Sequence, residues 1–434
     1  MTEHYEDSYL DLRREETAKL FMRDEECTPD VIRVAPVWPI AGSSGVITTD
    51  EGVVVVDLGI PADGPDRVRR IRQRTDKPFH SLIYTHGHGD HAGGVMAFIE
   101  DAQKNGHPRP RVIGHVNVAP RFEKYKMLAG RRAYIGRLQF PGRPGSASPQ
   151  RAVANPYLVP DTIVGDALKF RIGGLTIEIY HALGETDDCL WVWIPERKVA
   201  ILGDLLIGGC PNTGNPLKEQ RYTLEWAETL ETIAGKNPEH VIAGSGPVIR
   251  GNLIDAVLLD TAKLLRSIHE QVVGLLNQEL WIEDIIKRVK IPEDLAKKPW
   301  LAPTYGHPVF IIHDVYRRYT GWYDGNPSEL FPADSGEIAT EVLGLSGGEK
   351  QVMERARRLK EQGKAQLALH LIDFVIKGAQ ADATRKGALL LKSEILDARA
   401  DIEPSLIARN ILRTGAAIAR EQGGALKPIQ KKAK

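Results

Sequence analysis

The sequence predicts an α/β protein in which two β-sheets pack face to face with helices outside, followed by an all-helical region. From residue 31 to about residue 252, short apolar runs typical of strands alternate with amphipathic segments typical of surface helices. Beyond that point the apolar residues recur at helical spacing. We therefore expect four parts: an N-terminal arm at residues 1–30, an α/β domain at 31–252, a helical domain at 253–425 and a basic tail at 426–434.

The strands of the α/β domain are predicted from short apolar runs. Residues 45–57 predict a hairpin with an Asp-Glu-Gly turn, and the valines at 53–56 favour a central strand that is buried on both faces. Val68 and Ile71 lie at helical spacing among arginines, which predicts an amphipathic helix over residues 65–74. Further strands are expected at residues 81–84, 111–115, 163–170, 175–180, 190–194, 199–202 and 241–243, and a further helix at 226–233.

The helical domain is predicted from repeated amphipathic stripes. The longest stripe runs from Leu259 to Leu276. Helices that cannot bury an apolar face alone must stack on one another or on a second subunit. The expected helices lie within residues 259–276, 282–289, 367–375, 389–395 and 407–418.

The charge and cysteine content argue against several classes of protein. Lys and Arg together number 57, as do Asp and Glu, so the formal net charge is zero. This balance argues against a nucleic-acid partner, because phosphate binding usually leaves a basic footprint. Three cysteines without a Cys-x-x-Cys pair make no disulfide framework, and neither a signal peptide nor a membrane span is predicted. The expected location is the cytoplasm.

The richest cluster of metal-ligand side chains is the stretch from Thr85 to His91, which reads Thr-His-Gly-His-Gly-Asp-His. It follows an apolar run that predicts a strand and precedes the start of a predicted helix. It is therefore expected at the C-terminal end of a strand, where α/β sheets place their chemistry. The spacing lets His86 and His88 serve one metal ion while Asp90 and His91 serve an adjacent one. The alternative is a solvated loop that happens to contain histidines.

Two carboxylates at later strand ends extend this cluster. Glu185 lies in Gly-Glu-Thr-Asp-Asp after the strand expected at residues 175–180, and Asp204 follows the strand expected at 199–202. An unpaired charge directly after Ala-Ile-Leu-Gly is costly, and coordination of a metal would offset that cost. The alternative role for Asp204 is a helix N-cap.

The pattern His-x-His-x-Asp-His-x-Gly-Gly at residues 86–94 resembles the signature of the metallo-β-lactamase superfamily, and Asp57 sits where that superfamily has a strand-end Asp. Within the superfamily, the chain resembles the alkyl sulfatases and their smaller relatives. That branch uses Glu where most members have a His in a Gly-His-Thr turn, and Glu185 fits this substitution. The stretch Ala129–Tyr134 is similar to an arginine-rich segment of the branch, and Tyr316–Pro327 to the signature of its helical dimerisation domain.

This resemblance covers nearly all of residues 30–420 and implies an αββα sandwich, a dinuclear metal centre and dimerisation through the helical domain. Zinc is the default metal, while the carboxylate-rich ligand set leaves manganese or iron open. Carried over residue by residue, the implied ligands are His86, His88 and Glu185 for one metal, Asp90 and His91 for the other, and Asp204 as the bridge.

The ligands implied for the second metal depart from the family pattern at one position. The family's last ligand is a His in a Gly-His-Gly-like turn, and Ser245 occupies that position here. A neutral hydroxyl competes poorly with imidazole for a divalent ion. Three outcomes follow for the second metal: it binds weakly, it takes a water instead, or it is absent. Cys189 is either a compensating thiolate or, as we favour, a buried core residue.

The substrate side of the site departs from the branch as well. The His and Arg that would grip a sulfate have no confident match, and the lipid-carrier-like domain that usually follows in the branch is expected to be missing. A long-chain surfactant is therefore a poor candidate substrate. Arg221 is expected either to pair with an anionic group or to form a surface salt bridge. The Tyr-Gly-His-Pro turn around His307 favours a structural role for that residue. The candidate substrate contacts are Tyr134, Asn212, Arg221, Tyr305 and His307.

These features predict a metal-dependent hydrolase in which a metal-bound water attacks an ester-type bond of a small molecule. Asp90 is expected to orient the water and take part in proton transfer. The resemblance favours sulfate esters as substrates. The alternatives are a hydrolase of carboxylic esters, lactones or amides on the same centre, and a degenerate protein that binds a ligand or acts as a scaffold. The expected assembly is a homodimer without nucleic-acid or membrane partners.

Overall fold

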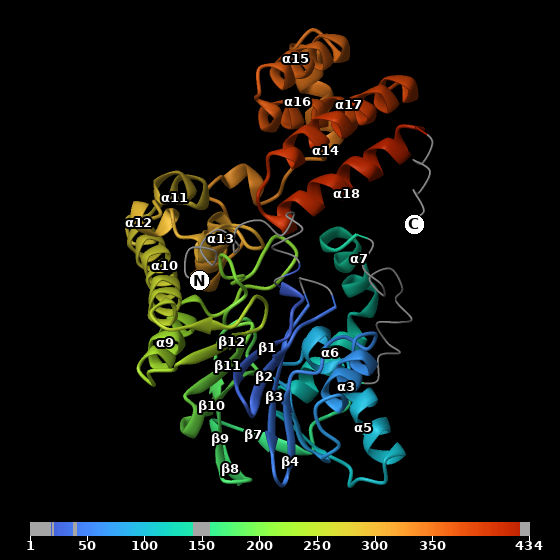
Figure 1. Ribbon diagram of the computed structural model, residues 1–434. Coiled ribbons are helices and arrows are strands. Elements are labelled where there is room, and N and C mark those ends of the chain that lie inside the picture. The colour runs from blue at the N-terminus through green and yellow to red at the C-terminus, as the bar shows by residue number, and fades with distance from the viewer. Residues whose placement is uncertain (1–18, 20, 38–40, 142–156, 426–434) are drawn as a thin grey trace. The chain divides into compact units, whose positions relative to one another are not determined.

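The computed structural model describes residues 19, 21–37, 41–141 and 157–425, and the chain folds into two compact units (Figure 1). The basic tail and residues 1–18 of the expected arm lie outside the described residues. The first unit takes the described residues of 1–132 and 149–321, and the second takes those of 133–148 and 322–434.

One β-sheet of the first unit follows the order of its strands in the chain. Its first four strands pair antiparallel and the remaining pairs are parallel. The predicted hairpin is confirmed, and the four valines at 53–56 are fully buried. The strands are β1 (Glu25–Thr28), β2 (Val31–Val34), β3 (Ser44–Thr49), β4 (Gly52–Val56), β5 (Phe79–Ile83), β6 (Arg111–His115) and β7 (Thr162–Val164).

The other sheet has six strands among the described residues and is antiparallel except between β11 and β12. The prediction of a single strand over residues 163–170 is wrong. The chain turns at Gly165 and Asp166, so that β7 pairs with β6 in the first sheet while β8 pairs with β9 in the second. In sheet order the strands are β13 (Ile249–Arg250), β12 (His240–Ala243), β11 (Val199–Gly203), β10 (Cys189–Ile194), β9 (Leu175–Ala182) and β8 (Ala167–Ile172).

The inner faces of the two sheets share one apolar core. Val54 and Ile83 of the first sheet and Ile179 and Val192 of the second belong to the same cluster of buried side chains. Alternate residues of each strand face this layer, because successive strand side chains point to opposite faces. The sheets therefore form the two central layers of a sandwich.

Helices cover the outer face of the first sheet. Val68 of α3, Phe98 of α5 and Phe122 of α6 pack against the buried outward side chains Val55 and Leu82. The helix predicted over 65–74 is confirmed as α3. The elements that follow β4 and precede β7 are α3 (Gly64–Arg72), α4 (Gly89–Ala92), α5 (Val95–Lys104), α6 (Val118–Met127) and α7 (Ala129–Gln139).

A second set of helices covers the outer face of the other sheet, which completes an αββα sandwich (Figure 1). Trp191 and Leu202 of the sheet, Trp226 of α9, Leu265 of α10 and Val315 of α13 share one core. The elements are η1 (Pro195–Arg197), α9 (Thr223–Ala234), α10 (Leu253–Leu276), α11 (Ile282–Arg288), α12 (Glu293–Ala296), η2 (Pro299–Leu301) and α13 (Pro308–Tyr319).

The division between the compact units does not coincide with the expected domain boundary at residues 252 and 253. Helix α10 buries its apolar face against α9 and the sheet, so the first unit continues to residue 321. An amphipathic stripe in the sequence shows that a face is buried, but it does not show against which partner. The boundary at 252 and 253 stays a prediction.

The second unit is helical, as expected. Ala356, Ile372, Ile395 and Ala416 come from four successive helices and meet in one core. Asp334 caps α14 by accepting hydrogen bonds from two backbone amides. Its elements are η3 (Pro327–Glu329), α14 (Ser335–Leu345), α15 (Glu349–Glu361), α16 (Ala365–Gly378), α17 (Asp382–Asp401) and α18 (Leu406–Gln422). Across the described part of both units, no helix is long and apolar enough to cross a membrane.

Candidate metal centre

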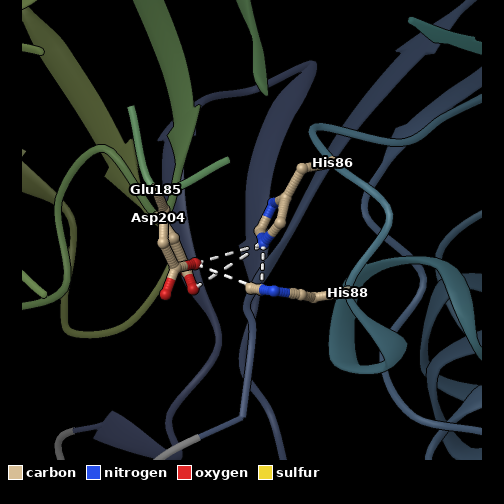
Figure 2. A group of neighbouring side chains, drawn as sticks. All are labelled: His86, His88, Glu185 and Asp204. Carbon is tan, nitrogen blue, oxygen red and sulfur yellow. Dashed lines mark hydrogen bonds and ion pairs between the residues drawn. The ribbon is translucent and has the colours of Figure 1, made fainter. Parts of the chain in front are cut away.

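The predicted ligands leave the ends of three strands. His86 and His88 follow β5, Glu185 follows β9, and Asp204 follows β11. Figure 2 shows the two imidazoles approaching from the first sheet's side and the two carboxylates from the other. Because the sheets face each other, the four residues meet although they lie far apart in the sequence.

Four donor groups converge at this point. His86, His88, Glu185 and Asp204 each offer one ligand atom, and these atoms lie within 4.8 Å of one another. The Glu185 Oε2 atom is 3.3 Å from His86 Nε2 and 3.2 Å from His88 Nδ1. Asp204 Oδ2 lies 4.0 Å from His86 Nε2. Two imidazoles and two carboxylates suit zinc, and also manganese or iron.

His91 lies next to this group with a carboxylate on each side. Its Nδ1 atom is 2.6 Å from Asp57 Oδ2, and its Nε2 atom is 3.2 Å from Asp204 Oδ1. Asp57 also accepts hydrogen bonds from the amide and the hydroxyl of Thr85, both at 2.8 Å. A carboxylate hydrogen-bonded to Nδ1 fixes the orientation of the His91 ring and makes Nε2 a better metal ligand. The backbone of Asp57 has a φ of 64°, a strained conformation for a residue other than glycine.

Among the predicted metal ligands, two buried side-chain atoms have no hydrogen-bond partner in the described part of the chain. They are His91 Nε2 and Glu185 Oε2, and both face the other donors. Leaving such atoms unsatisfied is costly, so each calls for a missing partner. A divalent cation between the imidazoles and the carboxylates would satisfy both. The residues present therefore fit a metal.

The pKa values of the two carboxylates at the site shift in opposite directions. Burial raises the pKa of Glu185, but the Arg221 guanidinium and His88 outweigh it, so that the pKa lies well below its usual range. Burial raises the pKa of Asp204 to about 6, against the opposing charge of His91. Burial lowers the pKa of His88 to about 3, which keeps the ring neutral and able to bind a metal.

The oxygens of Glu185 have separate partners. Oε2 faces the two histidines, while Oε1 accepts hydrogen bonds from Arg221 Nη1 and, at 3.2 Å, from Asn212 Nδ2. Arg221 also donates to the carbonyl of Asn212. Its backbone amide donates to Asp314 Oδ2 at 2.9 Å. Both Asn212 and Arg221 were predicted as substrate contacts, and that role stays a prediction.

The loop that carries His86, His88 and His91, here called the histidine loop, is held by Asp188 as well as by Asp57. Asp188 Oδ2 accepts a hydrogen bond from the amide of Gly87 at 2.9 Å and lies 2.9 Å from Arg121 Nε. Sequence reasoning gave Asp188 no role. The signal was the Asp-Asp pair directly after Gly-Glu-Thr, since a buried carboxylate so close to a candidate ligand needs a partner.

Asp90 and Ser245 are not among the four converging donors. Together with Asp204 they line an open pocket with about 500 Å³ of atom-free space, including its mouth. Tyr305 lines the same pocket, and burial raises the pKa of its hydroxyl. The structure brings together the ligands of the first predicted metal half and the bridge, and it places His91 of the second half beside that bridge. The predicted catalytic role of Asp90 stays a prediction.

The remaining candidates have other surroundings. His307 Nδ1 accepts a hydrogen bond from the amide of Val309 and so caps α13, which fits the favoured structural role. Tyr134 is an exposed residue of α7 in the second compact unit. Cys189 is buried, contacts Thr186, and has a pKa raised by burial to about 12. Cys189 also belongs to the apolar core of the first unit, which fits the favoured role as a core residue.

Family models match most of the chain. Residues 37–245 match the metallo-beta-lactamase superfamily, and residues 281–422 match the alkyl sulfatase dimerisation family. With its αββα sandwich and its His/Glu/Asp cluster, the chain belongs to the metallo-beta-lactamase superfamily. Within that superfamily it is a member of the alkyl sulfatase-like branch.

Curated relatives include the linear primary-alkylsulfatase of Pseudomonas sp. (strain ATCC 19151), which is 25% identical over 76% of this chain and 66% of its own length. The (R)-specific secondary-alkylsulfatase of Pseudomonas sp. is 24% identical over 90% of this chain and 61% of its own length. The chain thus spans less than two thirds of these relatives. The solved structure of the stereoselective inverting sec-alkylsulfatase Pisa1 from Pseudomonas sp. is 22% identical, with a TM-score of 0.79 over 94% of this chain and 67% of that one. At this identity the likeness shows the fold.

Proposed function

We propose that this protein is a metal-dependent hydrolase of small sulfate esters. The observation that carries the proposal is the convergence of His86, His88, Glu185 and Asp204 at the strand ends of an αββα sandwich. The names of the relatives, which are alkylsulfatases, support sulfate esters as the substrate class.

The proposed metal ligands are supported by this geometry for four residues and by the family resemblance for the others. His86, His88 and Glu185 would hold the first metal, and Asp204 faces both halves of the site. Asp90 and His91 would complete the second half, which lacks an imidazole at Ser245. Zinc is the proposed metal. A bound divalent cation lowers the pKa of a water ligand and stabilises negative charge that develops on the substrate.

The residues around the ligands fix the ligand loop in position and line the pocket beside it. Asp57 and Asp188 fix the histidine loop through hydrogen bonds to its backbone and to His91. Asp90 lines the open pocket next to Asp204, where a substrate has access. From that position its carboxylate is proposed to orient the attacking water and to accept its proton. We also propose a homodimer, supported by the match to the dimerisation family.

A substrate panel tests this proposal against its alternatives. Zinc-loaded protein is incubated with short alkyl sulfates, carboxylic esters and lactones, before and after removal of the metal by a chelator. Metal-dependent release of inorganic sulfate, abolished in Glu185→Ala and retained in the control Asp30→Asn, is the expected result. Asp30 pairs with Arg197 on the surface of the same unit.

Other outcomes of the panel contradict the proposal. Turnover of esters or lactones without sulfate release identifies a carboxylic ester hydrolase on the same centre. If metal-loaded protein turns over none of these substrates, the result favours a non-catalytic binding protein.

A further inference from the structure

We infer that Asp314 and Arg221 are positioning residues that fix Glu185 for the metal, so that helix α13 completes the metal centre. The inference rests on the proposed function only in taking Glu185 as a metal ligand. It assigns part of the site to a segment that lies within the match to the dimerisation family, outside the match to the metallo-beta-lactamase superfamily.

The first step is the division of labour between the two oxygens of Glu185. Oε1 is taken by Arg221 and Asn212, whereas Oε2 accepts no hydrogen bond from the described residues and is aimed at the two histidines. A carboxylate held by one oxygen presents the other in a fixed direction. Such outer contacts orient ligands and set metal affinity. The Arg221 side chain is 7% exposed, so solvent screens this ion pair little.

The second step is the anchor of Arg221 itself. Its backbone amide donates to Asp314 Oδ2 at 2.9 Å, across 93 positions of sequence. Gly214, with a φ of +136°, passes so close to Asp314 that a Cβ there would overlap Oδ1. Only glycine combines this backbone conformation with this approach. The loop between β11 and α9 thus packs closely against α13 at Gly214 and is hydrogen-bonded to it at Arg221.

The third step is the rigidity of the helix that carries Asp314. Ile311, Ile312 and Val315 of α13 are buried in the core shared with α9, α10 and the sheet. A side chain on a well-packed helix holds its position better than one on a loop. The chain of contacts therefore runs from the packed helix through Asp314 and Arg221 to the ligand oxygen.

The test measures zinc affinity rather than turnover. Metal-free protein competes for zinc with a chromophoric chelator, and near-ultraviolet circular dichroism confirms that each variant is folded. Asp314→Ala is expected to weaken zinc binding by roughly 10- to 100-fold. Asp314→Asn keeps an oxygen that can accept from the Arg221 amide, so it should recover most of the affinity. The control Asp30→Asn should bind as the wild type does.

A double-mutant cycle separates positioning from a general effect on the fold. In a Glu185→Ala background, Asp314→Ala should cause no further loss of zinc affinity, because its effect passes through Glu185. Gly214→Ala displaces the same contact without removing a charge and should also weaken binding, which keeps the test informative if Asp314→Ala does not fold.

Two results overturn the inference while the proposed function stands. Folded Asp314→Ala or Gly214→Ala protein that binds zinc with wild-type affinity is one. A loss that adds in full to that of Glu185→Ala is the other. A wild-type chain that takes up no zinc contradicts the proposed function, and the inference is overturned with it.

Discussion

Single residues of this site act through the strand ends on which they stand. His86, His88, Glu185 and Asp204 could be predicted to meet because each follows an apolar strand, and strand ends of facing sheets gather at one edge. The contact of Asp314 with Arg221 could not be predicted. It joins a helix to a loop through a packing arrangement that no local pattern of residues specifies.

The open second half of the site leads to a prediction for Ser245. Ser245 lines the pocket beside Asp90 and Asp204, so there is room for a larger ligand side chain. Ser245→His is expected to strengthen binding of a second zinc ion by at least about tenfold, or about 1.4 kcal/mol. Calorimetric titration of metal-free protein measures this, with Ser245→Ala as the matched control. Unchanged affinity in the histidine variant would contradict the placement of Ser245 beside the second metal.

A pH prediction concerns Asp314. Burial raises the pKa of its carboxyl from 3.8 to about 7, against the opposing hydrogen bond from the Arg221 amide and the charges of Arg221 and Arg317. Between these values the folded chain binds more protons than the unfolded chain, so stability falls as the pH rises through that window. The slope reaches at most about 1.4 kcal/mol for each pH unit.

Asp314→Asn removes this titration. Its free energy of unfolding, from urea titrations of metal-free protein, should fall less between about pH 5 and about pH 7 than that of the wild type. Equal slopes for the two proteins would show that the Asp314 carboxyl does not titrate in this range.

At the scale of elements, the sequence predicted the type of each element better than it predicted which other elements that element packs against. The long stripe from Leu259 predicted a helix, and α10 is that helix. Its burial against α9 and the sheet could not be predicted, because an apolar stripe fits any apolar surface. The strand predicted at 163–170 failed for a related reason: β7 and β8 are both apolar enough for a strand, but they pair in different sheets.

The packing of α10 can be tested with two adjacent leucines. Leu258 is fully buried in the first unit's core, whereas its neighbour Leu259 is 45% exposed. Leu258→Ala should lower the free energy of unfolding by about 2–5 kcal/mol. Leu259→Ala should change it by about 0.5 kcal/mol or less. Denaturant unfolding that gives both variants the same small loss would contradict the placement of α10 within this unit.

At the scale of the whole molecule, the fold class could be predicted because the chain changes from strand-like to helical patterning along its length. The αββα sandwich and the helical second unit both bear this out. The assembly of the molecule stays a prediction. Several large apolar side chains of the second unit are exposed, among them Phe331 at 93% and Leu345 at 90%. Both residues lie in the region that matches the dimerisation family, which makes them candidates for the interface.

A homodimer is therefore expected, and sedimentation velocity measures it. The double variant Phe331→Lys and Leu345→Lys should shift the protein towards monomer, because two cations would be buried without partners. Glu341→Lys, an exposed polar site on α14, is the matched control and should leave the dimer intact. A wild-type chain that sediments as a monomer at every concentration would contradict the dimer.

The metal content of the purified chain tests the central claim most directly. Protein is loaded with zinc, freed of excess metal by gel filtration, and analysed by mass spectrometry for metal per folded chain. The wild type should retain at least one zinc ion, and a variant that lacks both His86 and Glu185 should retain none at that position. Wild-type protein that remains free of zinc, manganese and iron after such loading would contradict the account of this site as a metal centre.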